Sequence, residues 1–325
     1  MNLVTGATGF VGSYIVRALV AKGEKVRALK RANSNTHLLK DIEGQFEWFE
    51  ADILDVVALE ASMKNVDFVY HSAAMISFVK SEVPMMHKIN IEGTANVVNA
   101  CISNNIKKLV HVSSVSAFGR YEIKETIDEN MKWKDHEDNT QYAISKFRSE
   151  LEIWRGREEG LKAVIVNPST ILGFGDWKNG SSQIFKNVYD QIKFYPTGIN
   201  GFVGVEDVAN ACIKAMESNI EGERLIVSAE NKSFKDIFFA IAKGFGVKPP
   251  SNPVSPFLAA VGWRFYWLKS KLLGQQPLVT KETTTYTARD YRYKNDKIKE
   301  LLNFEFTPID VVIEKTCKQY LDAQK

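Results

Sequence analysis

The sequence predicts an α/β protein that contains a doubly wound parallel sheet and a smaller, mostly helical C-terminal region. Up to about residue 168, short apolar strands alternate with amphipathic helices, which is the pattern of a sheet built from strand–helix–strand units. The first strand leads directly into a glycine-rich turn and a helix. From residue 228 onward, the pattern becomes mostly helical.

The composition is that of an ordinary globular protein. The chain has 325 residues, of which 45% are hydrophobic and 25% charged. Its net charge of +3 is too small to argue for nucleic acid or an anionic membrane as a partner. The three cysteines, Cys101, Cys212 and Cys317, match no metal-site spacing and no disulfide framework. Because we find neither a signal peptide nor a membrane span, we expect a cytoplasmic protein.

The first helix follows the first strand through a turn that predicts an anion site. Met1–Val4 is a short apolar strand, Thr5–Gly12 is the turn, and Ser13–Lys22 is typical of an amphipathic helix. Unpaired N–H groups and the positive end of the helix dipole converge at such a helix start.

Three glycines give this turn the properties that a dinucleotide needs. Gly6 allows the sharp turn, Gly9 lets a pyrophosphate approach the bare backbone, and Gly12 lets the helix pack close to its strand. Three glycines alone also fit a purely structural turn. The strand before them and the helix after them favour dinucleotide binding.

The second strand, Lys25–Leu29, ends in two cations, Lys30 and Arg31. A fold that prefers NAD usually has an acidic residue here, which holds the ribose 2′-hydroxyl. A guanidinium can instead bind a 2′-phosphate through two hydrogen bonds, so the pattern favours NADP over NAD. The alternative is that Arg31 simply points into solvent.

The third strand, Phe46–Phe49, is followed by Asp52. Because polar residues at the carboxyl end of a strand lie on the ligand edge of such a sheet, Asp52 is a candidate acceptor for an adenine amine. An equally good interpretation makes it the cap of the next helix, which we expect near Leu54.

The fourth strand, Phe68–Tyr70, ends in two small residues that let a cofactor pass closely, Ala73 and Ala74. Between them and the strand lies His71. It has no second metal-spaced partner, so we interpret it as a hydrogen-bonded structural histidine rather than a ligand.

The alternation continues through two further strands. A long helix is expected at Met85–Asn104, followed by the strand Leu109–Val112 with Ser114 just beyond it. After a polar, irregular stretch, Thr140 opens another helix, and Lys162–Asn167 forms a sixth strand.

The pattern changes beyond residue 168. Short strands are expected at Gly201–Gly204 and Arg224–Val227, with a helix at Val205–Ser218 between them, and further helices follow. We therefore assign residues 1–168 and 201–227 to the dinucleotide-binding domain and residues 169–200 and 228–325 to the substrate-binding region.

The aromatic segment Phe257–Leu268 has three interpretations that the sequence leaves open. It forms a helix packed on the core, a wall of the substrate pocket, or a helix lying at a membrane surface.

A tyrosine and a lysine in the helix after Thr140 are candidates for catalysis. Tyr142 and Lys146 lie four residues apart, so their side chains share one helix face. A free tyrosine has a pKa near 10, and an adjacent ammonium favours its phenolate. Tyr142 can then exchange a proton with a carbonyl or hydroxyl as a hydride moves, while Ser114 hydrogen-bonds the same oxygen. Taken alone, the pair also fits an ordinary surface helix.

Together, these motifs resemble those of the extended short-chain dehydrogenase/reductases, a superfamily that includes NAD(P)-dependent epimerases and dehydratases. Thr5–Gly12 resembles its cofactor loop, and Ser114, Tyr142 and Lys146 resemble its catalytic triad. The resemblance extends from the N-terminus to about residue 230, more weakly beyond, and implies a Rossmann-type fold.

The resemblance adds further cofactor positions. Asp52 and Ile53 match the adenine site, Asn90 matches a helix position linked to a proton relay, and the segment 167–170 resembles the loop near the nicotinamide. The full set of candidate cofactor-binding residues is Gly6, Thr8, Gly9, Phe10, Val11, Gly12, Lys30, Arg31, Asp52, Ile53, Ser72, Ala73, Ala74, Asn90, Pro168 and Thr170.

Two segments of the chain help to distinguish between two branches of this superfamily, the sugar-nucleotide epimerases and the dihydroflavonol-reductase-like enzymes. Sugar-nucleotide epimerases usually carry Arg-Asp-Phe just before the segment that matches Val203–Val208, whereas this chain has Asn200–Phe202 there. Arg27–Arg31 instead resembles the NADP-binding strand end of the dihydroflavonol-reductase-like branch. Four aromatic residues suit an apolar carbonyl substrate or form core, namely Phe78, Trp177, Trp263 and Trp267.

We therefore expect an NADP-dependent oxidoreductase, with NAD as the alternative cofactor, that interconverts a ketone or aldehyde and its alcohol. A nucleotide-sugar epimerase or dehydratase with tightly bound NAD(P) is one alternative. A non-catalytic dinucleotide-binding regulatory protein is the other. The expected partner is a small carbonyl or alcohol substrate, without nucleic acid or a membrane span, and helix-pair homodimers are common in the family.

Overall fold

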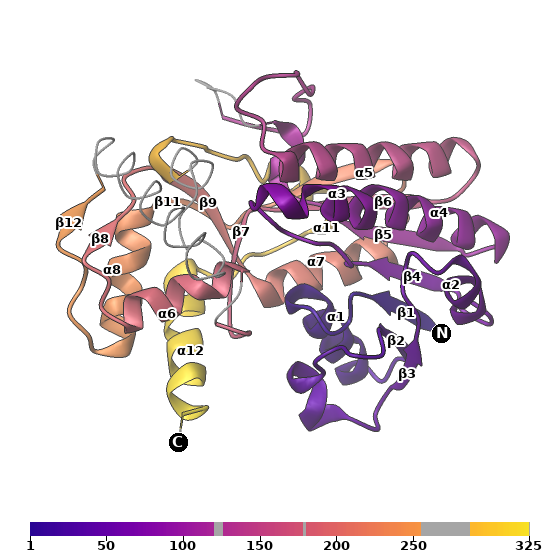
Figure 1. Ribbon diagram of the computed structural model, residues 1–325, viewed down its shortest axis with the longest axis horizontal. Helices are drawn as coiled ribbons and strands as arrows, with labels where there is room; N and C mark the ends of the chain where they lie inside the picture. Colours follow the sequence, from indigo (N-terminus) through magenta and orange to yellow (C-terminus); the bar gives the residue numbers. More distant parts are fainter. Residues whose placement is uncertain (120–125, 178–179, 255–286, 325) are drawn as a thin grey trace.

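The computed structural model describes residues 1–119, 126–177, 180–254 and 287–324 (Figure 1). Its centre is a seven-stranded sheet in the order β10-β6-β5-β4-β1-β2-β3, in which all neighbouring strands are parallel. The predicted doubly wound sheet is therefore confirmed. Its strands are β1 (Asn2–Thr5), β2 (Val26–Lys30), β3 (Glu47–Glu50), β4 (Phe68–His71), β5 (Lys108–Val112), β6 (Ala163–Pro168) and β10 (Glu223–Val227).

The order of the strands along the chain reverses between β1 and β4, which are neighbours in the sheet. Loops that leave such a reversal diverge to opposite faces and leave a crevice where ligands bind. Both strands are largely buried on both faces, as expected for the centre of a parallel sheet. The chain topology therefore predicts the main site at the carboxyl ends of β1 and β4.

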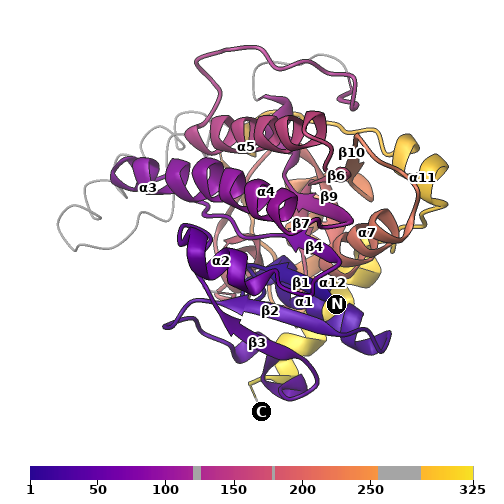
Figure 2. The same cartoon turned by 90° about the vertical axis from the view of Figure 1, so that its right-hand side faces the viewer.

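Helices cover both faces of this sheet (Figure 2). One face carries α1 (Phe10–Ala21) and α7 (Val205–Glu217), which pack against each other. The opposite face carries α2 (Val56–Ser62), α4 (Gly93–Ser103) and α5 (Gln141–Glu158).

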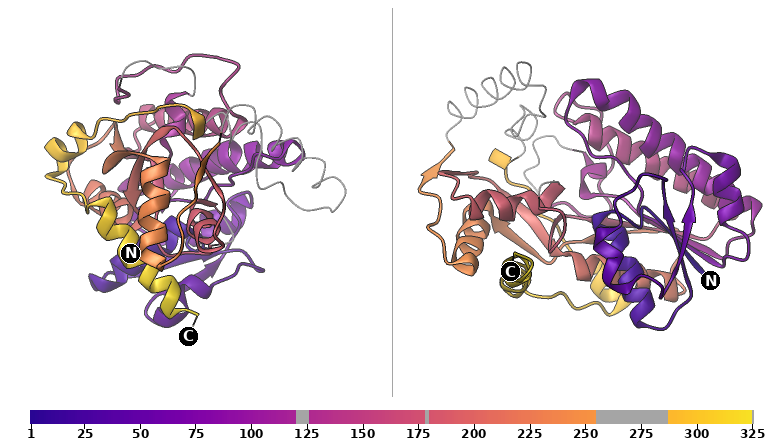
Figure 3. Two further views of the ribbon diagram at one scale, coloured as in Figure 1. Left: turned by 90° about the vertical axis from the view of Figure 1, so that its left-hand side faces the viewer. Right: turned by 60° about the horizontal axis from the view of Figure 1, so that its bottom comes forward.

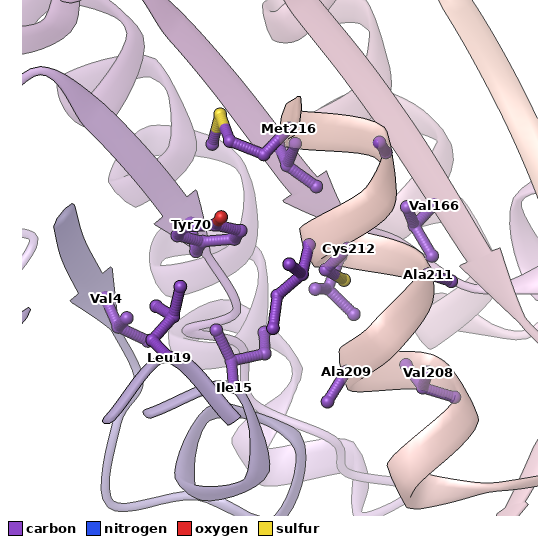
Figure 4. Close-up of a cluster of buried hydrophobic side chains, with 14 of the residues drawn as sticks. Val4, Ile15, Leu19, Tyr70, Val166, Val208, Ala209, Ala211, Cys212 and Met216 are labelled. Atoms are coloured by element: carbon purple, nitrogen blue, oxygen red, sulfur yellow. The ribbon is translucent and has the colours of Figure 1, made fainter. Parts of the chain in front are cut away.

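Two apolar cores fill the spaces between the sheet and its helices. Figure 4 shows part of the first, in which Ile15 and Leu19 of α1 lie in one cluster with Tyr70 of β4 and Cys212 of α7. The second core joins the other face of the sheet to α2, α4 and α5. These two cores hold the strand ends rigidly in place.

Two helices differ from the expectation in their bounds. The first begins at Phe10 rather than Ser13, because Gly9 in extended conformation serves as its N-cap. The helix expected at Met85–Asn104 consists of α3 (Val83–His87), a π-helical turn that contains Asn90, and α4. Such π-helical turns frequently mark functional sites.

A smaller region carries a second sheet in the order β11-β9-β7. Its strands are β7 (Thr170–Leu172), β9 (Ile199–Gly204) and β11 (Glu230–Ser233). Among the described residues, the region from residue 228 onward is mostly helical, as expected, but it also contains two strands that were not expected, β11 and the short β12 (Asn252–Pro253). The strand expected at Gly201–Gly204 belongs to this small sheet, and the division into two domains stays a prediction.

Helices of this region enclose a third core, in which α8 (Phe234–Phe245) and α12 (Ile309–Asp322) lie side by side (Figure 3). Trp177 belongs to it and stacks on Tyr320, with ring centroids 4.8 Å apart. The remaining elements are α6 (Gln183–Tyr189), β8 (Phe194–Tyr195) and α11 (Asp296–Leu302).

The aromatic segment Phe257–Leu268, with Trp263 and Trp267, lies outside the described residues. Within the four described ranges, no helix combines the length and the apolarity that crossing a bilayer requires.

Candidate active site

The glycine turn lies where the chain topology places the crevice. Gly6 has a φ of +66°, and a Cβ atom there would come within 2.6 Å of the backbone nitrogen of Ala73. Ser72 reinforces the contact between the two strand ends, because its Oγ donates to the carbonyl oxygen of Thr5 at 2.8 Å. The ends of β1 and β4 thus touch through backbone, with Ala73 and Ala74 next in the chain.

The start of α1 offers free backbone rather than side chains. Its N-cap, Gly9, is exposed and provides no side-chain hydrogen bond to the first turn. A Cβ on Gly12 would collide with the carbonyl group of Gly6, so the helix can lie this close only with glycine there. A Cβ on Gly9 would meet only the Gly6 carbonyl oxygen, at 3.1 Å. This bare helix start, with its unpaired N–H groups, fits the diphosphate of a dinucleotide.

The side chains of the other candidate residues in the turn make contacts within the protein. The ring of Phe10 packs edge-on against Tyr14, with centroids 6.0 Å apart, and lies against Gly175 in the loop after β7. Val11 packs on the first core, and Thr8 is half-buried. The side chain of Phe10 therefore joins the turn to the smaller region.

The end of β2 carries the predicted cations. Arg31 is exposed, and its backbone N–H donates to Ser34 Oγ at 3.0 Å. Within the described part of the chain, its guanidinium has no hydrogen bond or ion pair. The Nζ of Lys30 lies 5.9 Å from the ring centroid of Trp48. Arg31 is thus able to reach an anion without first breaking a protein contact.

The structure separates the two roles considered for Asp52. Its Oδ1 accepts a hydrogen bond from the backbone of Leu54 at 2.9 Å, whereas Asp55 is the residue that caps α2. The expectation that Asp52 caps this helix is therefore wrong, because the helix begins at Val56. Ile53 is buried beneath α4, where its side chain would meet any Cβ placed on Gly93.

His71 is held by hydrogen bonds on both ring nitrogens. Thr94 Oγ1 donates to the carbonyl of Asn90 at 2.6 Å, so it accepts from His71 Nε2 at 2.9 Å. The Nδ1 atom then accepts from the hydroxyl of Thr5 at 2.7 Å. Burial lowers the pKa of His71 to about 3, with Lys146 adding to the effect, so the ring is neutral. Among the described residues, no cluster suited to a metal ion is present.

Asn90 binds the β4 loop to α5. Its Oδ1 accepts from the backbone N–H of Met75 at 2.8 Å, and its Nδ2 donates to the Met75 carbonyl at 2.9 Å. The same Nδ2 lies 2.9 Å from Ser145 Oγ, on the helix that carries the predicted catalytic pair. Asn90 thus fixes the segment along which the resemblance places the cofactor.

The predicted catalytic pair lies on α5, whose N-cap is Thr140, since Thr140 Oγ1 accepts from Ala143 N at 3.0 Å. Lys146 is only 2% exposed, and its Nζ donates to the carbonyl of Val112 at 2.9 Å. Burial lowers its pKa to about 8, against the opposing charge of Glu150. The ammonium therefore predominates at neutral pH, at the carboxyl end of β5.

Tyr142 is half-buried one helical turn before Lys146, on the same side of α5. Its ring lies edge-on to Phe78, with centroids 6.3 Å apart. An aromatic residue on the segment after β4 thus borders the candidate acid.

Ser114 follows β5 and begins a short 3-10 turn that packs against α5. Its Oγ accepts from the backbone N–H of Ser116 at 3.1 Å and lies 3.1 Å from Ser116 Oγ. The hydroxyl is therefore held at the carboxyl end of the strand next to β4.

Pro168, the last residue of β6, is buried, and Thr170, the first residue of β7, accepts a hydrogen bond at Oγ1 from Asn200 Nδ2 at 2.7 Å. Asn200 lies in β9. It serves here to join β9 to β7.

Sequence reasoning missed the hydrogen-bond network of Glu150. This carboxylate is buried four residues after Lys146 and accepts from Ser113 Oγ at 2.5 Å and Asn167 Nδ2 at 2.6 Å. Burial raises its pKa, while the bond from Ser113 and the charge of Arg224 oppose the rise. The spacing of four from Lys146 was the available signal, because it places both groups on one helix face.

The fold and this site define a dinucleotide-binding α/β enzyme. A model of the NAD dependent epimerase/dehydratase family matches residues 2–228. The chain therefore belongs to that family. Its helix-borne Tyr142 and Lys146 and its turn at Gly6 lie within the matched part.

Among curated proteins, one relative is named "Putative dihydroflavonol 4-reductase" from Synechocystis sp. It is 30% identical over 304 residues, which cover 90% of this chain and 87% of the relative. The cinnamoyl-CoA reductase 1 of Petunia hybrida is 27% identical over 331 residues, covering 97% of this chain and 90% of the relative. The resemblance to the dihydroflavonol-reductase-like branch is thus confirmed.

Solved structures agree with this fold. The crystal structure of gox2253 matches with a TM-score of 0.84 and 30% identity, covering 99% of this chain and 98% of that chain. The UDP-glucose 4-epimerase of Thermotoga maritima, solved with UDP-glucose, matches over 100% of both chains with a TM-score of 0.81 and 20% identity. At that identity, the second likeness supports the fold alone.

Proposed function

We propose that the protein is an NADP-dependent oxidoreductase that interconverts a ketone or aldehyde and its alcohol. The observation that carries the proposal is the buried ammonium of Lys146, held at the end of β5 and one helical turn from Tyr142. A cation kept dry at this place favours the ionised form of a nearby phenol more than it would in water. The names of the curated relatives, several of which are reductases, support the same reaction class.

Each of the three candidate catalytic residues has its own role in the proposed reaction. When bound, the reduced nicotinamide supplies the hydride that the carbonyl carbon receives. Tyr142 gives its hydroxyl proton to the carbonyl oxygen during reduction and accepts the proton during oxidation. Ser114 donates a hydrogen bond that positions the same oxygen, and Lys146 holds the nicotinamide ribose and favours the phenolate of Tyr142.

The cofactor is held in this proposal by the turn at Gly6, Gly9 and Gly12 and by the cations after β2. The exposed guanidinium of Arg31, with Lys30 next to it, suits a ribose 2′-phosphate and favours NADP over NAD. A carboxylate at the same place would repel that phosphate.

A nucleotide-sugar epimerase or dehydratase with tightly bound NAD(P) is the second candidate. The name of the family, which covers epimerases and dehydratases, favours it. Against it, the chain has Asn200 where the basic residue is expected, and this side chain is bonded to Thr170. The third candidate, a non-catalytic regulatory protein that binds the dinucleotide, has no need of Tyr142 beside Lys146.

The remaining proposals concern the protein's location, its substrate and its oligomeric state. We propose a cytoplasmic protein with a small carbonyl or alcohol substrate and leave its oligomeric state open, a helix-pair homodimer being the assembly to test first. Phe78, beside Tyr142, suits an apolar substrate.

The decisive test follows NADPH absorbance with a panel of apolar ketones and aldehydes, and with UDP-sugars as controls. A reductase consumes NADPH stoichiometrically with a carbonyl substrate. An epimerase converts a UDP-sugar without net NADPH consumption, and that result would replace the proposal. Binding of NADPH with no turnover of any compound would favour the regulatory protein.

A further inference from the structure

A buried polar network links α5 to residues of β6 and β10 and to the residue that follows β5. Figure 2 shows α5 lying along this part of the sheet, beside β6 and β10. The centre of the network is the carboxylate of Glu150, which is 1% exposed. A charge is rarely buried this completely unless several groups bind it. The groups that bind Glu150 therefore indicate what it does.

Three adjacent strands, or the residues next to them, supply these groups. One oxygen, Oε1, accepts from Ser113 just after β5 at 2.5 Å and from Asn167 of β6 at 2.6 Å. The other, Oε2, lies 3.7 Å from Nη1 of Arg224 on β10. The remaining nitrogens of Arg224 are held by the carbonyl of Glu129, at 2.9 and 2.8 Å. Glu150 thus connects α5 to three adjacent strands at the catalytic edge of the sheet.

Asn167 carries this connection to Ser114. Its Nδ2 donates both to Glu150 Oε1 and, at 3.0 Å, to the backbone carbonyl of Ser114. Both neighbours of this nitrogen are acceptors only, so the amide must turn its NH₂ group toward them. A carboxylate at position 150 therefore fixes the orientation of the Asn167 amide, and that amide fixes the main chain of Ser114.

We propose that Glu150 is a positioning residue that acts through Asn167 to hold Ser114 where its hydroxyl meets the substrate oxygen. The inference rests on the proposed role of Ser114. Glu150 touches neither substrate nor cofactor in this account. The requirement at position 150 is an acceptor oxygen, which glutamine also provides and alanine does not.

Two substitutions separate this role from a general loss of structure. Glu150→Ala should lower kcat about tenfold or more, because a small displacement of a positioned group is costly in rate. The dissociation constant of this variant for NADPH should stay within about twofold of the wild-type value, because the glycine turn that binds the cofactor lies at the ends of β1 and β4 and not at Glu150. Glu150→Gln should keep kcat within about threefold, because its amide oxygen still accepts from Ser113 and Asn167.

The matched control is Glu152→Gln, the same change two residues further along α5. Glu152 is partly exposed and pairs with Arg155 at 2.9 Å. We expect wild-type kcat, NADPH binding and stability within error.

A double-mutant cycle with Ser114→Ala tests the path itself. If Glu150 acts through Ser114, then adding Glu150→Ala to Ser114→Ala should lower kcat no further. Losses that multiply would overturn the proposal, because a purely structural role does not depend on the Ser114 hydroxyl. Should Glu150→Ala fail to fold, Asn167→Leu breaks the same path and takes its place in the cycle.

A second measurement keeps the inference separate from the proposed function. If the wild type reduces no carbonyl compound, the proposed function fails, and crystal structures of the Glu150 variants decide the inference alone. Ser114 Oγ should move by about 1 Å in Glu150→Ala, enough to matter for rate, and stay in place in Glu150→Gln. An unmoved Ser114 and an unturned Asn167 amide in Glu150→Ala would refute it.

Discussion

The contact between the cofactor turn and β4 predicts the effect of adding one methyl group at Gly6. Gly6 has a φ of +66°, and its Cβ would lie 2.6 Å from Ala73 N and 2.7 Å from Ala73 Cα. The positive φ costs an alanine about 1–2 kcal/mol. Forcing the two backbones apart adds about 1–3 kcal/mol, as for other overpacked sites. Gly6→Ala should therefore lower the free energy of unfolding by about 2–5 kcal/mol.

The chain offers a matched control for the two contributions. Gly23 has a φ of +76°, but no atom lies within 4 Å of its Cβ position. Gly23→Ala should therefore cost only the conformational part, about 1–2 kcal/mol. Any gain from the stiffer unfolded chain is common to both variants and cancels in their difference.

Urea unfolding of the two variants and the wild type gives both free energies. NADPH binding, followed by its fluorescence, reports whether the turn still forms. We expect Gly6→Ala to be the less stable variant and to bind NADPH weakly, while Gly23→Ala binds normally. Equal unfolding free energies would refute the close approach of the turn to Ala73.

Three further predictions concern the 2′-phosphate, α5 and the buried ammonium. Arg31→Ala should weaken NADPH binding by about tenfold or more and leave NADH nearly unchanged, which fluorescence titration can measure; equal losses would reject the 2′-phosphate role. Thr140→Ala removes the cap of α5 and should cost about 1 kcal/mol in urea unfolding, and no change would contradict that cap.

The third prediction, a pH dependence, follows from the lowered pKa of Lys146, about 8 in the folded protein. Between this value and its usual pKa near 10.4, the unfolded chain binds more protons, so the stability of the wild type relative to Lys146→Met should rise with pH. The rise is at most about 3 kcal/mol, and a flat difference would show that the ammonium is not desolvated.

The centre of the sheet could be predicted from the sequence because β1, β4, β5 and β6 are almost entirely buried. Strands buried on both faces are mostly apolar, and these four are, apart from a few polar residues such as Lys108 and His111 of β5. The strand β11 could not be read, because Glu230–Ser233 is polar and has no apolar alternation. Its conformation depends on antiparallel pairing with β9, a contact that no local pattern encodes.

In the candidate site, too, some residues could be predicted from the local sequence and others could not. The glycine turn, Tyr142 and Lys146 have fixed local spacings, and these can be recognised in a single sequence. Glu150 looks like a solvated charge on a helix, because only the packing of α5 against the sheet buries it. The same holds for Asn90, whose partner Met75 is 15 residues away. Networks of this kind depend on tertiary contacts, which spacing alone does not reveal.

The hydroxyl of Tyr142 is proposed to supply the proton in an NADPH-consuming reduction. The most direct measurement compares Tyr142→Phe with the wild type, using a carbonyl substrate from the panel and NADPH titration in parallel. We expect Tyr142→Phe to bind NADPH as the wild type does and to have a kcat lower by about a hundredfold or more. An unchanged kcat in Tyr142→Phe would contradict the proposed role of this hydroxyl.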